Sequence, residues 1–260
     1  MKNSLLLIFL LLISTAFSQP SFDLIITDGK IIDGTGNSWF YGDVGIQAGK
    51  IAAIGKLSGE FAIKTISAKG LIVAPGFIDV HTHIEGNDLK VPTADNFIYD
   101  GVTSVVTGNC GGPNVDINDY FRKLDSVKTS INVATLIGHN SVRREIMGES
   151  NRTPTDDEQK RMEDLVERAM QDGAVGFSTG LIYVPGTYSK TDEVIGLARA
   201  ASKYNGIYAS HIRDEGDDVL DAIEEAINIG RQANMPVEIS HFKVTYKPNW
   251  GRSAQTLDKV

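Results

Sequence analysis

The sequence predicts an α/β protein in which most of a TIM-type (β/α)8 barrel follows a small β subdomain. Three patterns support this fold class. Between residues 69 and 260, six apolar runs of strand length alternate with helical patterns. Before them, shorter runs are separated by turn residues over residues 20–68. In addition, all five histidines and the single cysteine lie at or just beyond the ends of the longer runs.

The segment of residues 20–68 contains only short strand-like runs, and we expect it to form part of a β-sandwich. The runs are FDLIIT, KIID, DVGIQ and IAAIG. Turn residues separate them at Asp28-Gly29, at residues 34–36 and at residues 48–50. This alternation predicts a small unit built from strands.

The six longer runs predict the strands of the barrel, which we expect to span residues 69–260. They are LIVAPGFIDVHTH, VTSVVTGNCG, NVATLIGHN, GAVGFSTGL, GIYASHI and PVEISHFK. Near-continuous apolar strands joined by amphipathic helices indicate a parallel sheet that is buried on both faces. Such a sheet could be an open, doubly wound sheet or most of a barrel. The sequence has neither a GxGxxG fingerprint nor a P-loop, which favours the barrel.

Two of the intervening helices have clear boundaries. Thr155 and Glu158 have the spacing of a capping box, and Gly173 follows the apolar face of the same helix. The later helix, which carries Val219 and Ile223, is expected to end before Asn234 and Pro236. The chain ends at Val260 inside the helix expected after the sixth strand, so we expect the last two βα units to lie beyond it.

The first nineteen residues have the pattern of a signal peptide. Lys2 supplies a positive charge, residues 5–13 are apolar, and residues 16–18 resemble a cleavage site before Gln19. No later run reaches the length of about 20 apolar residues that a membrane anchor needs. We therefore expect an exported protein, periplasmic or secreted, without a stable membrane anchor. The net charge of −8 argues against a nucleic-acid partner.

The histidines and the cysteine are the candidate functional residues. The active site of a barrel lies at the carboxyl ends of its strands, so residues that are distant in sequence would meet at one mouth. His81 and His83 are two residues apart on a strand and project to the same side. The residues expected to converge are His81, His83, Cys110, His211 and His241. His139 could instead brace neighbouring loops.

Cys110 has no partner for a disulfide within the chain, because it is the only cysteine. It could be a buried apolar residue, an intermolecular cross-link or a metal ligand. Gly108, Gly111 and Gly112 are interpreted as room for the backbone to turn near a site. Asp79 could orient a ligand or form a strand-end hydrogen bond. The acidic residues between positions 214 and 225 are expected to form the solvated face of a helix.

Taken together, APGFIDVHTH, VTSVVTGNCG, GAVGFSTGLIYVPG, YASHIRDEG and VEISHFK resemble the amidohydrolase superfamily of metal-dependent hydrolases. Within this superfamily, the combination of the HTH motif with a cysteine at the second strand end resembles the pattern of the N-acyl-D-amino-acid deacylases, also called D-aminoacylases. The resemblance implies that Cys110, His211 and His241 hold one zinc ion tightly, and that His81 and His83 belong to a weaker second metal position. It also implies that Lys243 and Tyr183 contact the polar end of the substrate, and that the catalytic aspartate lies beyond Val260.

The resemblance implies a small-molecule substrate, an N-acyl-D-amino acid, whose amide bond is cleaved to a D-amino acid and a carboxylate. The chemistry of the residues is compatible with zinc, which prefers thiolate and imidazole ligands, although manganese, iron or cobalt could occupy such a site. Two alternatives remain. A cyclic amidase or dipeptidase of the hydantoinase or dihydroorotase kind would use a carboxylated lysine between two metals. A catalytically silent barrel would only bind a ligand.

Overall fold

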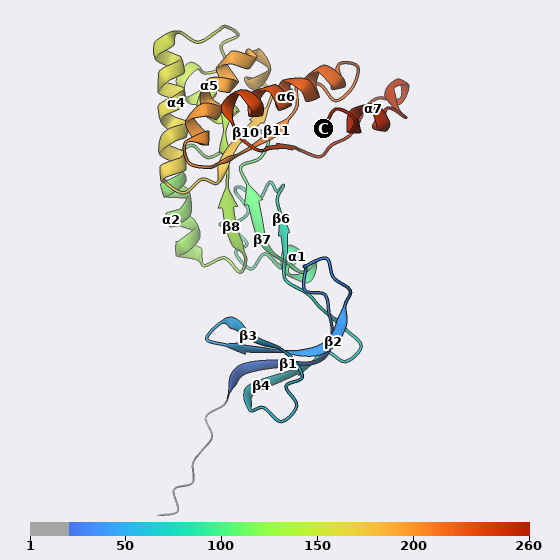
Figure 1. Cartoon of the computed structure of the whole chain (residues 1–260). Coiled ribbons are helices and arrows are strands. Elements are labelled where there is room, and N and C mark those ends of the chain that lie inside the picture. Colours follow the sequence, from blue (N-terminus) through green and yellow to red (C-terminus); the bar gives the residue numbers. More distant parts are fainter. Residues whose placement is uncertain (1–20) are drawn as a thin grey trace, which may run out of the picture. The chain divides into compact units, whose positions relative to one another are not determined.

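The computed structural model describes residues 21–260, which form two compact units (Figure 1). The first unit ends at Pro75 and the second is Gly76–Val260. The expected boundary after residue 68 differs from this division, because strand β5 (Ile72–Val73) pairs with strand β1 (Phe22–Ile31) of the first unit. The predicted signal peptide lies outside the described residues.

The first unit is a mixed sheet of five strands. Besides β1 and β5 it contains β2 (Phe40–Gln47), β3 (Lys50–Gly55) and β4 (Ala62–Ser67), in the order β3-β2-β1-β4. The antiparallel pairs are β1 with β2 and β2 with β3, whereas β4 and β5 run parallel to β1. The predicted run FDLIIT and the first two residues of KIID form one strand, β1, whose pairing is irregular between Ile26 and Gly29.

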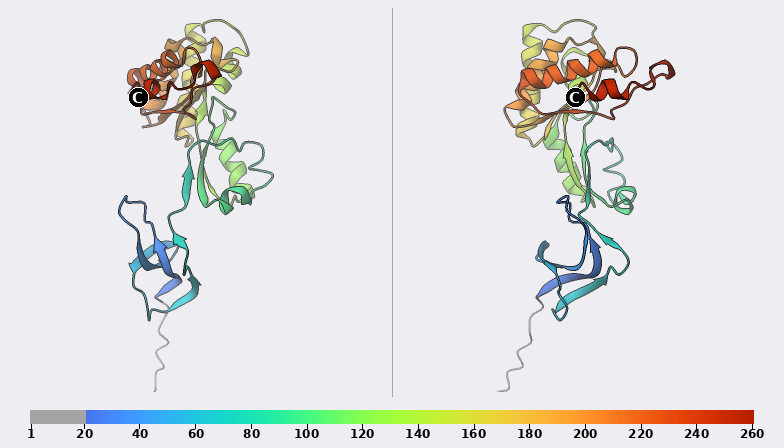
Figure 2. Two further views of the ribbon diagram at one scale, coloured as in Figure 1. Left: turned by 90° about the vertical axis from the view of Figure 1, so that its right-hand side faces the viewer. Right: turned by 45° about the vertical axis from the view of Figure 1, so that its right-hand side comes forward.

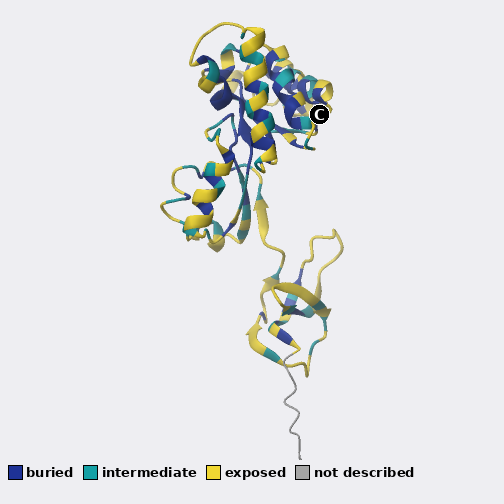
Figure 3. Ribbon diagram, turned by 90° about the vertical axis from the view of Figure 1, so that its left-hand side faces the viewer, coloured by how far each residue is buried: buried dark blue, intermediate teal, exposed yellow. Residues whose placement is uncertain are grey.

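The described residues of the first unit supply one sheet, and the second sheet that a sandwich requires is not among them. Buried apolar residues are few, namely Phe22, Ile25, Ile31, Val44 and Ala68. Much of the ribbon of this unit has the colour of exposed residues in Figure 3. Large apolar side chains such as those of Phe61 and Ile63 are exposed. The burial pattern therefore describes a sheet with a small core rather than a closed sandwich.

The second unit contains six parallel strand positions that are neighbours in chain order. One sheet has the order β6 (Phe77–Asp79), β7 (Val102–Thr107), β8 (Asn132–Thr135), and the other joins β9 (Ile137–Gly138), β10 (Gly176–Gly180), β11 (Ile207–His211) and β12 (Val237–Ile239). The third strand position is divided at Leu136. The part before it, β8, pairs with β7, and the part after it, β9, pairs with β10.

This strand order distinguishes between the two predicted arrangements. A doubly wound sheet reverses its strand order at a switch point, whereas the strands here follow one another without a reversal. The order is that of a (β/α) barrel, as predicted. Among residues 76–260 no strand joins β12 to β6, so the described part forms an open arc of the barrel.

Helices cover the outer face of this arc (Figure 1, Figure 2). The helices are α1 (Asp95–Tyr99), α2 (Ile117–Val127), α3 (His139–Met147), α4 (Asp156–Gln171), α5 (Thr191–Ser202), α6 (Val219–Ala233) and α7 (Ser253–Leu257). Short 3-10 turns lie at Gly186–Tyr188 and Lys247–Asn249. Within residues 21–260, no helix combines the length and apolar character needed to cross a membrane.

The core of the second unit lies between the helices and the strands β9 to β12. Met162 and Val166 of α4, Leu197 of α5 and Ile223 of α6 are fully buried beside Phe177 of β10. Burial of each such side chain contributes roughly 1.5–3 kcal/mol to the free energy of unfolding. This packing fixes the strands whose carboxyl ends carry His211 and His241.

The predicted helix boundaries are confirmed. The hydroxyl of Thr155 accepts from the backbone N–H of Glu158 at 3.3 Å, and the Glu158 carboxylate accepts from the backbone N–H of Thr155 at 2.8 Å. Helix α4 ends just before Gly173, which has a positive φ of 109°. Helix α6 ends at Asn234, whose left-handed conformation is typical of a helix C-cap.

Candidate functional site

Cys110 lies in a tight turn that directly follows β7. Gly108, Cys110 and Gly111 have φ values of 75°, 54° and 78°, in the left-handed region. A Cβ atom at Gly108 would lie 2.2 Å from the carbonyl oxygen of Leu136, and one at Gly111 would lie 2.2 Å from Oδ1 of Asn140. The turn therefore requires glycine at both positions, as predicted. Gly112 has no such requirement, since the nearest atom would be 3.7 Å away.

Two side chains hold this turn in place. Glu85, which the sequence did not single out, accepts hydrogen bonds from the Thr107 hydroxyl at 2.5 Å and the Gly108 backbone N–H at 2.6 Å. The Ser178 hydroxyl accepts from the Gly111 N–H at 3.1 Å and donates to the Gly108 carbonyl at 2.5 Å. The backbone that carries the Cys110 side chain is thus held by hydrogen bonds before and after this residue.

His211 and His241 approach the sulfur from the next part of the arc. His211 is the last residue of β11, and His241 follows β12. Cys110 Sγ lies 3.5 Å from Nδ1 of His211 and 3.9 Å from Nε2 of His241. The same two nitrogens are 2.9 Å apart. These three atoms form one of the two groups of the described residues that could hold a metal ion.

The spacing of the three atoms agrees with a metal site. A tetrahedral zinc ion separates its sulfur and nitrogen ligands by roughly 3.5 Å, and two nitrogen ligands by roughly 3.3 Å, given bonds of about 2.3 Å to sulfur and 2.0–2.1 Å to nitrogen. The two sulfur–nitrogen distances are close to this value, and the two nitrogens lie slightly closer together. The donor set therefore fits the ion without a large rearrangement.

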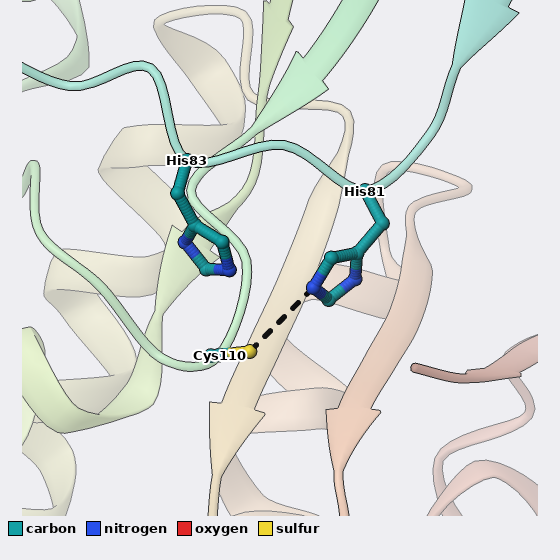
Figure 4. Close-up of side chains that lie close together, drawn as sticks. All are labelled: His81, His83 and Cys110. Atoms are coloured by element: carbon teal, nitrogen blue, oxygen red, sulfur yellow. Dashed lines mark hydrogen bonds between the residues drawn. The ribbon is translucent and has the colours of Figure 1, made fainter. Parts of the chain in front are cut away.

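His81 and His83 form the second group together with Cys110 (Figure 4). Both follow β6, and their rings meet edge to face with centroids 5.2 Å apart. Nε2 of His81 lies 3.7 Å from Cys110 Sγ. Asp79 accepts from the His81 backbone N–H at 3.2 Å, so it forms the strand-end hydrogen bond, one of the two predicted roles. Cys110 is shared by both groups.

Burial favours the neutral, metal-binding form of two of these imidazoles, those of His211 and His81. It lowers the pKa of His211 to about 4, with a further contribution from neighbouring His241. Burial also lowers the pKa of His81, and the charges of His241 and His83 act in the same direction. Burial raises the pKa of Cys110 to about 11, with smaller contributions from Glu238 and Glu215. A bound cation would oppose that last shift, because it favours the thiolate.

Glu215 is a member of the site that the sequence analysis missed. Its Oε1 lies 3.1 Å from Nδ1 of His241 and 3.6 Å from Nε2 of His211, and it forms an ion pair with Lys243. The residue precedes α6, and its side chain is only 11% exposed. The prediction that the acidic residues between positions 214 and 225 form the solvated face of a helix is therefore wrong for Glu215. It is also wrong for Glu225, whose carboxylate binds Arg213 at 2.8 Å.

Lys243 and Tyr183, the expected substrate-binding residues, border the same group. Nζ of Lys243 lies 3.0 Å from Nδ1 of His241. The Tyr183 ring meets the His211 ring edge to face with centroids 4.7 Å apart, and half of Tyr183 is exposed. Burial, with the charges of Cys110 and Glu215, raises the pKa of the Tyr183 hydroxyl. Both side chains thus lie where a molecule at the candidate site would meet them.

His139 lies outside the two groups of the described residues. It is fully buried at the start of α3, where Nε2 is 2.9 Å from Oε1 of Glu193. Glu193 also pairs with buried Arg143, whose guanidinium donates to the carbonyl of Arg152 at 2.7 Å. His139 therefore braces neighbouring segments, the alternative that the sequence left open.

The fold and the site together define a class of protein: a (β/α)-barrel protein with potential metal ligands at its strand ends. A sequence model described as "Amidohydrolase family" matches residues 64–259, and the chain belongs to this family.

Two named relatives within this family are similar to nearly all of the chain. D-aminoacylase of Alcaligenes xylosoxydans xylosoxydans is 40% identical over 270 residues, which cover 95% of this chain and 56% of the relative. N-acyl-D-glutamate deacylase of the same organism is 39% identical over 264 residues, which cover 93% of this chain and 54% of the relative. The chain thus spans about half the length of these relatives.

Solved structures agree with the sequence comparisons. A D-aminoacylase variant in complex with copper chloride superposes with a TM-score of 0.88 at 38% identity, covering 91% of this chain and 55% of that chain. The N-acyl-D-glutamate deacylase of Bordetella bronchiseptica, complexed with zinc and a phosphonate inhibitor, gives 0.87 at 40% identity with the same coverage. A D-hydantoinase gives 0.60 at 22% identity over 84% of this chain and 51% of that chain, a likeness of fold alone.

Proposed function

We propose that the protein to which this chain belongs is a zinc-dependent hydrolase that cleaves the amide bond of N-acyl-D-amino acids. The observation that carries the proposal is the convergence of Cys110, His211 and His241 from three strand ends, with sulfur–nitrogen distances of 3.5 and 3.9 Å. The names of the relatives, which include D-aminoacylase and N-acyl-D-glutamate deacylase, support the substrate class.

In this proposal Cys110, His211 and His241 hold the zinc, and His81 and His83 contribute to a weaker second position. Zinc in such a site supplies Lewis acidity and lowers the pKa of water to about 7. Thiolate and imidazole ligands support the choice of zinc over magnesium or calcium, which prefer oxygen ligands. The group that moves the proton in the reaction is proposed to be an aspartate beyond Val260.

Lys243 and Tyr183 are proposed to bind the polar end of the substrate. The ammonium group of Lys243 is partly exposed beside His241, so a substrate carboxylate can approach it from solvent. The Tyr183 hydroxyl can donate a hydrogen bond, because a tyrosine is protonated at neutral pH and burial raises the pKa of this one further. Together they would orient the acyl amide toward the metal ligands.

Cyclic-amide hydrolysis of the hydantoinase kind has less support. It calls for a carboxylated lysine between two metals, and the candidate at a strand end is Lys243. The ammonium of Lys243 instead forms an ion pair with Glu215, the arrangement of a charged lysine. An assay of hydrolysis would distinguish both enzymes from the third alternative, a catalytically silent barrel that only binds a ligand.

The assay compares three substrates on the purified full-length protein: N-acetyl-D-methionine, N-acetyl-L-methionine and a 5-substituted hydantoin. Hydrolysis of the D substrate well above the other two would support the proposal. Preferential opening of the hydantoin would replace it with the cyclic-amidase function. Zinc binding without hydrolysis of any substrate would favour the silent barrel.

We further propose that the protein is exported and that residues 1–19 act as its signal peptide. The proposal rests on Lys2, the apolar residues 5–13 and the small residues before Gln19. The mass of the protein recovered from the periplasm or medium tests it. A mature form that begins near Gln19 is expected, whereas a full-length N-terminus in the cytoplasm would contradict export.

A further inference from the structure

We propose that Glu215 is a positioning residue that selects the metal-binding nitrogen of both His211 and His241 and orients Lys243. The inference rests on the proposed function only in taking Cys110, His211 and His241 as the metal ligands. Glu215 is not a member of either potential metal group of the described residues. Its role would be exerted through the two rings.

The two imidazoles present opposite atoms to Cys110 and to Glu215. His211 faces the sulfur with Nδ1 and Glu215 with Nε2, whereas His241 faces the sulfur with Nε2 and Glu215 with Nδ1. A carboxylate favours a protonated nitrogen on the side that faces it. Glu215 also pairs with the Lys243 ammonium, which lies 3.0 Å from the same Nδ1 of His241, so that this cation donates to the carboxylate and the ring nitrogen keeps its proton. The two nitrogens nearest to Cys110 are then unprotonated and ready to bind a cation.

Among the described residues, Nε2 of His211 has no partner besides Glu215. Nε2 of His211 is buried and makes no hydrogen bond, and Oε1 of Glu215 lies 3.6 Å away, within ion-pair range but beyond a hydrogen bond. An unpaired buried N–H is unfavourable, because it has lost its hydrogen bonds to water without a replacement. A small rotation of either side chain would form this bond, which makes Glu215 the specific partner of that nitrogen.

Glu215 is held in place independently of the histidines. Its backbone carbonyl accepts from the Thr245 N–H at 2.7 Å, which ties the loop before α6 to the segment after β12. In the same loop, Oδ1 of Asp214 accepts from the Gly216 N–H at 2.6 Å and the Asp218 N–H at 3.1 Å. The carboxylate is therefore presented by a fixed loop, as a positioning residue requires.

Lys243 completes the arrangement on the exposed side. Its ammonium pairs with Glu215, and its side chain is 45% exposed. Without the carboxylate, the contacts left to the ammonium among the described residues would be Nδ1 of His241 at 3.0 Å and the His241 carbonyl at 3.5 Å, both on one residue. Glu215 thus joins the ligand rings to the cation proposed to bind the substrate.

The test is zinc affinity, measured without substrate by competition with a chromogenic chelator on the full-length protein. Glu215→Gln should weaken zinc binding about 10–100-fold, the usual effect of losing an outer-shell partner. Glu215→Asp, which keeps the charge on a shorter stem, should restore part of the loss. The matched control is Glu224→Gln, which removes an exposed carboxylate of α6 that pairs with Lys259, and it should leave affinity unchanged.

A cobalt spectrum separates ligand geometry from folding. In Glu215→Gln saturated with cobalt, the visible bands should shift, while the circular dichroism of the metal-free protein matches wild type. Zinc affinity within about twofold of wild type would overturn the role of Glu215. Because no substrate is used, loss of zinc affinity in a protein that hydrolyses no N-acyl-D-amino acid would refute the proposed activity and leave the positioning role intact.

Discussion

Cys110 and His211 are 101 residues apart in the sequence, yet Sγ of the first lies 3.5 Å from Nδ1 of the second. The contact arises because β7 and β11 end at the same edge of the parallel arc, and because the turn after β7 directs the sulfur toward that edge. The stability of this turn and of the segments beside it therefore decides whether the metal ligands meet.

Gly108→Ala should destabilise the protein and weaken metal binding. The new Cβ would lie 2.2 Å from a backbone oxygen that cannot rotate away, and the φ of 75° is strained for alanine. We expect a loss of about 1–3 kcal/mol in the free energy of unfolding, measured by urea titration. Gly112→Ala is the control in the same turn, and it should change stability by less than about 0.5 kcal/mol. Equal effects of the two changes would contradict this account of the turn.

Glu193→Gln should destabilise the protein by about 3–5 kcal/mol, because it leaves the buried Arg143 guanidinium without its counter-charge. If the folded variant can be recovered, its zinc content should equal that of wild type, since His139 and Glu193 lie outside both candidate metal groups. Loss of zinc from a folded Glu193→Gln protein would show that His139 takes part in metal binding.

The same cluster predicts how stability changes in acid. Burial alone would raise the pKa of Glu193, but the hydrogen bonds and charges of His139 and Arg143 outweigh it and lower the pKa. A carboxyl whose pKa is lower in the folded state stabilises the protein above its unfolded pKa of about 4.3, and this contribution is lost as the pH falls through the folded value. Chemical unfolding between about pH 5 and 3 should therefore show declining stability, with a shallower decline in Glu193→Gln.

Lys243→Gln should raise KM for N-acyl-D-amino acids by about 10–100-fold, the loss expected for a hydrogen bond to a charged group. A smaller change in kcat is expected, because the carboxylate contact is made in both the ground state and the transition state. Lys259→Gln, at an exposed lysine that pairs with Glu224, provides the control. An unchanged KM in Lys243→Gln would remove Lys243 from the substrate site.

The sequence was sufficient to predict the strand order of the second unit and the residues that lie at its strand ends. Apolar runs and helix caps such as Thr155 and Asn234 are local features, and parallel strands in chain order follow from them. The break of the third strand at Leu136 was not predictable, because it depends on which neighbours the two halves pair with.

The roles of Glu215 and Glu85 could not be predicted for a similar reason. Periodicity identifies the exposed face of a helix only where the helix exists, and α6 begins at Val219, after Glu215. The loop before it turns the carboxylate inward through contacts with a distant segment at Thr245. A weak signal was present, since Glu215 follows His211 by four residues within HIRDE, and Glu85 follows His83 by two.

The measurement that tests the account most directly is the zinc content of the purified full-length protein, wild type against Cys110→Ala, by elemental analysis. Wild type should contain roughly one zinc ion per chain or more, and the variant should lose the tightly bound ion together with hydrolysis of N-acetyl-D-methionine. Thermal unfolding would establish that the variant is folded. A folded Cys110→Ala protein that retained its zinc and its activity would show that Cys110 only packs in its turn, and would contradict the account.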